Sequence, residues 1–188
     1  MGVKETIKKY ESYLRKDDYD EVFKNIQGTE RKELIDFLYN VCGVDVLSHM
    51  TSIPSRMFEG TSIKKLQIPD NITSIDSYAF TMSALNEVYM SDSVTSLGVG
   101  AFSGCNNLSK IRLSRSLTEI PQNCFDGCIS LSKVFIPDSV TYFGSNAFAN
   151  CANDLLLVAN HRKDSNSKFK TVKSEEGFYK KHLKFKRP

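Results

Sequence analysis

The chain repeats one pattern of 22 or 23 residues between residues 53 and 159, and this repeat constrains the fold more than any other feature. Phenylalanine recurs at intervals of 22, 22, 23 and 23 residues, at Phe58, Phe80, Phe102, Phe125 and Phe148. The fifth residue before each of them is also apolar: Ile53, Ile75, Leu97, Ile120 and Phe143. Self-similarity at a fixed period of this size is typical of a stacked repeat protein. We therefore expect each repeat to form one coil of a solenoid.

Each repeat also carries two apolar residues separated by one residue, as in Val134-Phe135-Ile136. This alternation predicts one very short strand per coil, whose outer two side chains face the core. Pro69 and Pro137 directly follow two of these strands, and proline ends a strand because it has no N–H to donate. Stacking the coils pairs the strands in parallel and buries a continuous core. The expected core pairs are Leu66/Ile68, Val88/Met90, Ile111/Leu113, Val134/Ile136 and Leu157/Ala159.

Small residues and glycines complete the pattern. Ala79, Ala101 and Ala147 each precede a repeat phenylalanine, with Cys124 in the fourth case, so this position requires a small side chain. Turns follow at "SGC" and "DGC", where glycine is free to adopt a positive φ. Upstream, Val44-Asp45-Val46 lies 22 residues before Leu66-Gln67-Ile68, which predicts a capping strand at the start of the stack.

Three cysteines recur with the same period, at Cys105, Cys128 and Cys151. The chain has five cysteines, an odd number, and a spacing of 23 residues is not that of a zinc site. Because no histidine or carboxylate recurs beside them, we interpret them as a column of small, semi-buried side chains. We expect no metal site and no cofactor.

These repeats resemble the leucine-rich repeats of the BspA-like (Treponema pallidum-type) class. Residues 120–143, "IPQNCFDGCISLSKVFIPDSVTYF", match that pattern almost position by position, as do residues 97–120, "LGVGAFSGCNNLSKIRLSRSLTEI". The resemblance covers residues 50–160. It implies an α/β repeat solenoid, a short right-handed leucine-rich-repeat coil with parallel short strands that contacts other proteins. It implies no catalytic residue, and a setting in bacterial surface, protist or phage proteins.

The two ends are expected to cap the stack. Residues 1–43 predict three short helices, the third with Thr29 as N-cap and Leu34, Ile35 and Leu38 on its apolar side. They form a helical cap or, alternatively, a separate partner-binding head. Residues 44–160 form the repeats, about five units plus the capping strand. Residues 161–188 predict a basic C-terminal cap with a loop, a short strand and a helix that begins at Ser174, whose Phe178, His182 and Phe185 cover the last coil.

Charge is unevenly distributed along the chain. Residues 161–188 carry ten Lys or Arg against three acidic residues, a net charge of +7, so the rest of the chain sums to −4. A solvated basic face is the favoured interpretation, ahead of nucleic-acid binding. No segment is apolar enough to span a membrane, and the N-terminus lacks the apolar core of a secretion signal. We expect an intracellular location, or a surface location if a leader has been removed.

The candidate binding residues point away from the core on the strands. The middle position of each strand reads Gln67, Tyr89, Arg112, Phe135 and Val158, and the position before each core pair includes Glu87, Lys110 and Lys133. Exposed Tyr, Arg and Phe are the residues that anchor protein interfaces, although single surface aromatics are also common. The sequence therefore predicts a protein-binding face on the strands.

Enzyme functions find little support, because His49, His161 and His182 lie outside the repeat core and belong to no catalytic motif. The first hypothesis is a non-catalytic protein-binding module, a monomer or weak oligomer whose partner is a protein. The alternatives are a self-assembling structural component, for example of a surface or a phage, and a tail that binds nucleic acid or another anionic surface.

Overall fold

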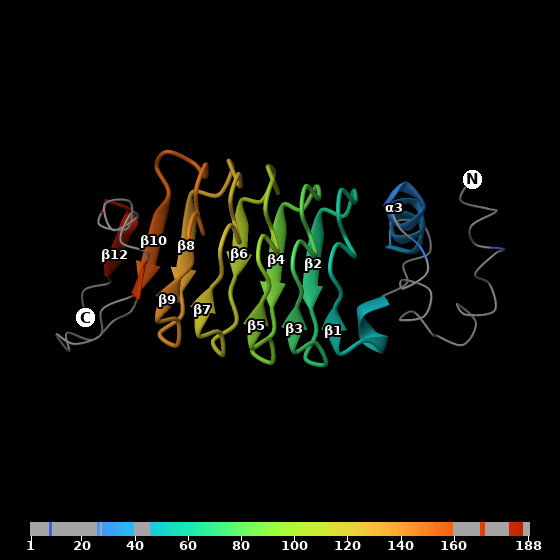
Figure 1. The fold of residues 1–188 in the computed structure, drawn as a ribbon, viewed down its shortest axis with the longest axis horizontal. Coiled ribbons are helices and arrows are strands. Elements are labelled where there is room, and N and C mark those ends of the chain that lie inside the picture. The colour runs from blue at the N-terminus through green and yellow to red at the C-terminus, as the bar shows by residue number, and fades with distance from the viewer. Residues whose placement is uncertain are drawn as a thin grey trace.

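The structure of the protein is a computed structural model, which describes residues 28–39 and 46–159, together with Lys8, Ile26, residues 170–171 and residues 181–185. The strands in these parts of the chain stack side by side into an elongated solenoid (Figure 1). Each repeat of the sequence forms one coil, so the expected repeat solenoid of parallel strands is confirmed. We name each coil by its repeat phenylalanine.

Each coil contains two strands, although the alternation of apolar residues predicted only one. The longer strands form one row, which Figure 1 shows beside a second row of two-residue strands. The first row contains β2 (Lys65–Ile68), β4 (Glu87–Met90), β6 (Lys110–Arg112), β8 (Lys133–Ile136), β10 (Leu156–Ala159) and β12 (Leu183–Phe185). The second contains β1 (Ser52–Ile53), β3 (Ser74–Ile75), β5 (Ser96–Leu97), β7 (Glu119–Ile120), β9 (Tyr142–Phe143) and β11 (Lys170–Thr171). The second row was missed because a strand of two residues is too short to show alternation.

The five repeat phenylalanines form one buried column through the centre of the stack. Neighbouring rings lie face to face, with centroid distances of 5.0, 5.0, 5.4 and 5.2 Å and interplanar angles between 8° and 15°. Backbone bonds run beside the rings: the Phe102 amide, for example, donates to the Cys124 carbonyl at 2.9 Å. The predicted core positions are buried, including the small residue before each later phenylalanine, Ala79, Ala101, Cys124 and Ala147.

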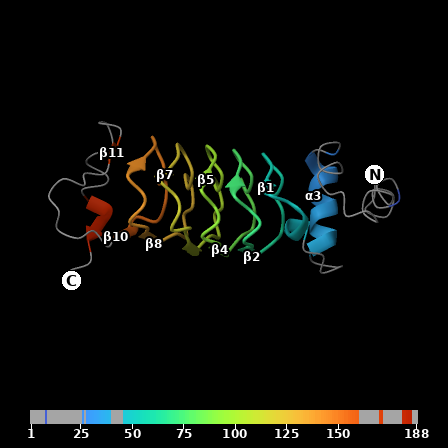
Figure 2. The same ribbon diagram turned by 90° about the horizontal axis from the view of Figure 1, so that it is seen from below.

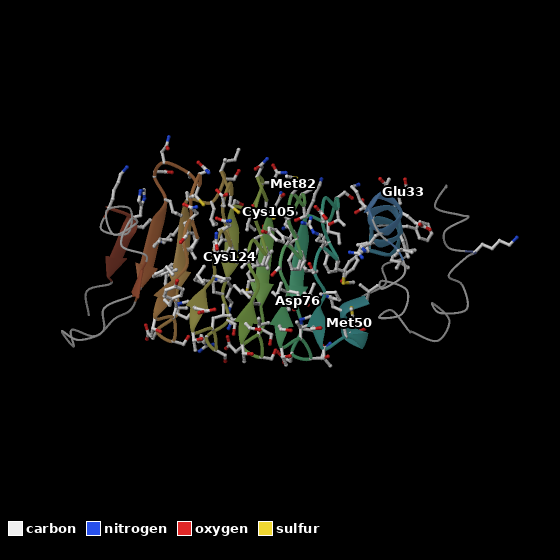
Figure 3. The ribbon with its side chains drawn as sticks, in the orientation of Figure 1. Glu33, Met50, Asp76, Met82, Cys105 and Cys124 are labelled. Carbon is white, nitrogen blue, oxygen red and sulfur yellow. The ribbon has the colours of Figure 1, made fainter. Side chains whose placement is uncertain are left out.

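Two columns of left-handed backbone bracket the phenylalanines. Two residues after each ring, φ lies between 52° and 76° at Gly60, Met82, Gly104, Gly127 and Asn150, which confirms the prediction for the glycine turns. The second column, two residues before each ring, was not predicted, and its residues also have positive φ: Arg56, Tyr78, Gly100, Asn123 and Asn146. Met82 lies at the upper edge of the stack in Figure 3, with 73% of its side chain exposed.

The cysteine column is more deeply buried than expected. Cys105 and Cys128 are fully buried, which corrects the semi-buried prediction, and only Cys151 is intermediate. Each thiol donates to the carbonyl of the phenylalanine one coil earlier: Cys105 to Phe80 at 3.0 Å, Cys128 to Phe102 at 3.2 Å and Cys151 to Phe125 at 3.1 Å. The thiols therefore hold neighbouring coils together.

The stack is interrupted at one junction, between the coils of Phe102 and Phe125. Strands β5 and β7, and likewise β6 and β8, are neighbours but belong to separate hydrogen-bonded sheets. At the matching position of other coils the Gly98 amide donates to Ile75 and the Gly144 amide to Ile120, whereas Pro121 has no N–H to donate. The ring distance is also widest here, at 5.4 Å.

Helix α3 (Gly28–Phe37) lies at one end of the stack, as Figure 2 also shows. Its predicted apolar residues Leu34, Ile35 and Leu38 are buried in the same core as the first coil, and Thr29 lies inside the helix rather than at its cap. Val46, expected in a capping strand, instead begins the short 3-10 helix η2 (Val46–His49). Val44, Asp45 and all but Lys8 and Ile26 of the first two predicted helices lie outside the described residues.

The C-terminal segment contributes strands that pair with the last coil. Strand β11 pairs with β9, and β12 pairs with β10, so Phe185, predicted on a helix, lies in a strand. The buried His182 lies 2.8 Å from the Leu155 carbonyl through Nδ1. Ser174 and Phe178 lie outside the described residues. Within the described parts of the chain, no helix is long and apolar enough to cross a membrane.

Candidate functional site

The outward sides of β2, β4, β6 and β8 form one continuous surface, the strand face. Strand register places Gln67 opposite Tyr89, and Tyr89 opposite Arg112. Gln67 and Arg112 are exposed and Tyr89 is half-buried. Phe135 is 51% exposed and is one of the few large apolar side chains that reach the surface among the described residues. Four of the five predicted side chains therefore reach the surface.

Val158 is the exception, and its expected exposure is wrong. It is only 8% exposed, because β10 is an inner strand between β8 and β12. Its backbone lies opposite Phe135 on one side and Lys184 on the other. Strand β12 comes from a segment that lacks the repeat pattern, so the sequence did not indicate that a further strand would pair beside Val158.

The positions before the first two core pairs, Lys65 and Glu87, form an ion pair on the strand face. Lys65 contacts Glu87 at 3.1 Å, and the Tyr89 hydroxyl donates to the same carboxylate at 3.2 Å. The hydrogen bond from Lys65 is the main cause that lowers the pKa of Glu87. The Glu87 carboxylate is therefore ionised at neutral pH, and it is bound by Lys65 and Tyr89 on the same face.

Two lysines lie over aromatic rings. The Lys110 ammonium is 5.1 Å from the Tyr89 ring centroid, and the Lys133 ammonium is 4.8 Å from the Phe135 ring centroid. A cation over an aromatic face is attracted by the ring quadrupole, and this contact leaves the positive charge uncompensated. The Tyr89 side chain also raises the pKa of Lys110, so this lysine stays protonated.

Two arginines share one carboxylate. Asp92 lies 3.0 Å from both Arg112 and Arg115, and it accepts a further hydrogen bond from the Arg115 amide. That backbone bond and the two guanidinium charges lower the pKa of Asp92. Two positive charges therefore meet one negative charge, and the group has a net charge of +1.

Arg115 was not among the predicted site residues, although the repeat contained a signal for it. The turn after each strand carries Asp70, Asp92 and Asp138 in three coils and Arg115 in the fourth. A charge reversal within an otherwise acidic repeat column is not required by the fold, because its neighbours form the same turn with aspartate. The charge of this turn position, compared from coil to coil, therefore distinguishes Arg115 from its aspartate counterparts.

Two hollows lie on the strand face. The central hollow, of about 540 Å³, lies over the junction between β6 and β8 and is lined by Tyr89, Lys110, Arg112, Arg115, Lys133 and Phe135, with Ile136, Pro137 and Asp138 at its rim. The flanking hollow, of about 580 Å³, is lined by Gln67, Asp70, Tyr89, Asp92 and Arg112, among others. The structure thus brings the predicted residues of three strands to one depression.

Ser139 also lines the central hollow, and its environment differs from that of its repeat counterparts. In earlier coils the Ser93 hydroxyl donates to the Ile72 carbonyl and the Ser116 hydroxyl donates to the Asp92 carbonyl. The Ser139 hydroxyl is buried and has no hydrogen-bond partner among the described residues. The hydrogen bond by which Ser93 and Ser116 join neighbouring coils is therefore not made by Ser139.

Other kinds of site find no support in the described parts of the chain. No group of three or more His, Cys, Asp or Glu there is arranged to hold a metal ion. Burial raises the pKa of the Cys105 thiol to about 11 and that of Cys151 to about 12, so neither is a reactive thiolate at neutral pH.

Comparison with protein families matches residues 39–155 to a model described as the BspA type leucine rich repeat region, in six copies. Comparison with curated proteins finds no match.

Among solved structures, a leucine rich cell surface protein from Faecalibacterium prausnitzii is 28% identical, with a TM-score of 0.52, over 68% of this chain and 33% of its own. This chain thus spans about a third of that protein's length. A leucine-rich repeat protein from Bacteroides capillosus is 30% identical, with a TM-score of 0.48, over 52% of this chain and 77% of its own. A leucine-rich repeat protein from T. pallidum is 24% identical, with a TM-score of 0.44, over 51% of each chain.

Proposed function

The chain belongs to the BspA-type leucine-rich repeat family, and on this premise we propose that it is a non-catalytic module that binds a protein partner through the strand face. Repeat solenoids of this kind present an extended surface on which partners bind. The observation that carries the proposal is the central hollow, where Tyr89, Arg112 and Phe135 from three consecutive strands border one depression. Aromatic and arginine side chains around a pocket are the usual anchors of protein interfaces.

The variation of these three side chains from coil to coil supports this proposal, because the repeat pattern does not require Tyr89, Arg112 or Phe135 at their positions. The core columns are apolar in every coil, whereas the outward column changes from Gln67 to Tyr89, Arg112 and Phe135. An exposed phenylalanine exposes apolar surface to water in the free protein. A partner that covers Phe135 removes this apolar surface from water, which favours binding at this position.

The test is affinity capture from extracts of the source organism with three immobilised proteins. These are the wild type, the triple variant Tyr89→Ala, Arg112→Ala, Phe135→Ala, and a control triple variant, Met82→Ala, Ile129→Ala, Tyr142→Ala. The control removes three large exposed side chains that lie outside the hollows. Each truncated anchor is expected to cost about 2 kcal/mol of binding free energy. A partner retained by the wild type and the control but not by the first variant supports the proposal.

Retention of every captured protein by all three proteins would exclude the strand face. Circular dichroism and urea unfolding of each variant would accompany the capture, because loss of binding is informative only for folded protein. The alternative functions are self-assembly as a structural component, for example of a surface or a phage, and binding of nucleic acid or another anionic surface by residues 161–188. No observation on the described residues favours either alternative.

A further inference from the structure

The cations around the central hollow outnumber the acidic groups. Lys110, Arg112, Arg115 and Lys133 line it, and Asp138 is the acidic side chain in the same lining. Asp92 neutralises part of the arginine charge from the neighbouring coil. The four cations and these two carboxylates give the hollow a net charge of about +2. On the neighbouring strands β2 and β4, by contrast, Lys65 and Glu87 neutralise each other in an ion pair.

The positive charge sits beside apolar surface in the same depression. Phe135 is 51% exposed and supplies most of this apolar surface, while Pro137 and the largely buried Ile136 also line the depression. Lys133 lies over the Phe135 ring, and Lys110 lies over the Tyr89 ring, so both ammonium groups border the depression from the two sides of the β6–β8 junction. A ligand seated between the strands meets both lysines and both rings.

Resting on the proposed protein-binding function, we propose that the central hollow binds an acidic segment of the partner protein, whose carboxylates contact Lys110, Lys133 and Arg115 and whose apolar side chain packs on Phe135. Charge complementarity selects the carboxylates, because bringing like charges against this surface is unfavourable. The exposed ring selects an adjacent apolar residue. An arginine fork pairs with a carboxylate in a bidentate geometry that fixes its orientation.

Arg115 indicates that the charge serves binding rather than the fold. The repeat places aspartate at this turn in the coils before and after it, at Asp92 and Asp138. Arg115→Asp therefore restores the residue that the same turn carries elsewhere and is expected to fold. It reverses one charge of the hollow without removing a core contact. Because it also removes the exposed Arg115–Asp92 ion pair, urea unfolding of this variant accompanies the binding measurement.

The experiment is fluorescence anisotropy with three labelled probes: a peptide of glutamates around one phenylalanine, the same peptide with glutamine for glutamate, and a deoxythymidine oligonucleotide of equal charge. The proteins are the wild type, Arg115→Asp, the double variant Lys110→Glu, Lys133→Glu, and a matched control, Lys64→Glu, Lys181→Glu. The control makes the same charge change at exposed lysines outside the hollow.

We expect the wild type to bind the acidic peptide more tightly than the glutamine peptide and the oligonucleotide. The double variant should weaken binding of the acidic peptide by about tenfold or more, because each lysine that attracts a carboxylate is replaced by a glutamate that repels it. Arg115→Asp should weaken it as well, and the control should leave it within about twofold.

Equal affinity for the glutamine peptide, equal or tighter binding of the oligonucleotide, or equal losses in the double variant and the control would each overturn the proposal. So would absence of binding at about 1 mM acidic peptide, a concentration at which even weak contacts are detected. Failure here is distinguishable from failure of the strand face itself. If capture of a partner still requires Tyr89, Arg112 and Phe135 while the acidic peptide does not bind, the strand face is the binding site but its partner does not present an acidic segment.

Discussion

Gly127 occupies a left-handed turn, and its backbone conformation is the reason that glycine stands there. Its φ is +76°, while an added Cβ would meet Gly104 only at 3.5 Å, an ordinary contact distance. We therefore expect Gly127→Ala to lower the free energy of unfolding by about 1 to 2 kcal/mol. Gly127→Asn should cost less, because asparagine tolerates this conformation and occupies the matching position at Asn150. Urea unfolding measures both, and equal losses would contradict the explanation.

Gly98 differs, because the space around it is the constraint. An added Cβ would lie 2.2 Å from the Ser77 backbone nitrogen in the preceding coil, so the two coils would have to move apart. Gly98→Ala is therefore expected to destabilise the protein more than Gly127→Ala does. A smaller loss for Gly98→Ala in the same urea series would show that the coils are not in such close contact.

The buried thiol of Cys105 makes stability depend on pH. Burial raises the pKa of this thiol from 9.0 to about 11, so the unfolded chain releases the thiol proton first. The protonated thiol makes its full contribution to the free energy of unfolding below about pH 9. This free energy falls as the pH rises toward about 11, by up to about 1.4 kcal/mol per pH unit.

Cys105→Ser isolates this effect, because a serine hydroxyl does not ionise in this range and has the donor needed for the Phe80 carbonyl. Between about pH 9 and about pH 11, the free energy of unfolding of the wild type should therefore fall relative to that of the Cys105→Ser variant. Parallel curves for the two proteins would show that the thiol ionises alike in the folded and unfolded states.

At the scale of the element, the phenylalanine column is the central support of the stack. Phe102 lies between Phe80 and Phe125, with ring distances of 5.0 and 5.4 Å, whereas Phe148 has a column neighbour on one side only. Phe102→Ala should lower the free energy of unfolding by about 3 to 5 kcal/mol, because it leaves a cavity and removes two stacked contacts. Phe102→Leu should lose less. Equal effects in chemical denaturation would argue against a role for ring stacking.

The coils were predictable from the sequence because each buried column repeats the same type of residue. The apolar columns, the small residue before phenylalanine and the glycine turns all follow from one period. The break between β5 and β7 was not predicted, although Pro121 was visible directly after β7, because its effect depends on which carbonyl its missing N–H would have met. That requires the position of the neighbouring coil in space.

The strand face was predictable in part. Alternation placed Tyr89, Arg112 and Phe135 outward, since it depends only on local geometry. The burial of Val158 depends on β12, which returns beside β10 from a segment without the repeat. The hollow is lined by residues of β4, β6 and β8 and crosses the junction between two sheets, an arrangement that no single repeat encodes.

At the scale of the whole molecule, one core runs from the helix α3 end through the last coil. Leu34 and Ile35 on α3 belong to the same buried cluster as Phe58 and Leu157. We therefore expect Leu34→Ala to destabilise the entire stack, by about 2 to 5 kcal/mol, in a single cooperative transition. Far-ultraviolet circular dichroism and tyrosine fluorescence should report the same midpoint. A separate early transition of the N-terminal segment in this variant would mean that α3 is an independent unit.

Binding of a protein partner at the strand face can be detected by site-specific photo-crosslinking. A benzophenone amino acid replaces Phe135 on the strand face or, as the control, Ile129, which is also an exposed large apolar residue but lies outside both hollows. After irradiation in extracts of the source organism, we predict a covalent adduct with a specific protein from position 135 and none from position 129. Equal adducts from both positions, or an adduct from position 129 alone, would contradict the account.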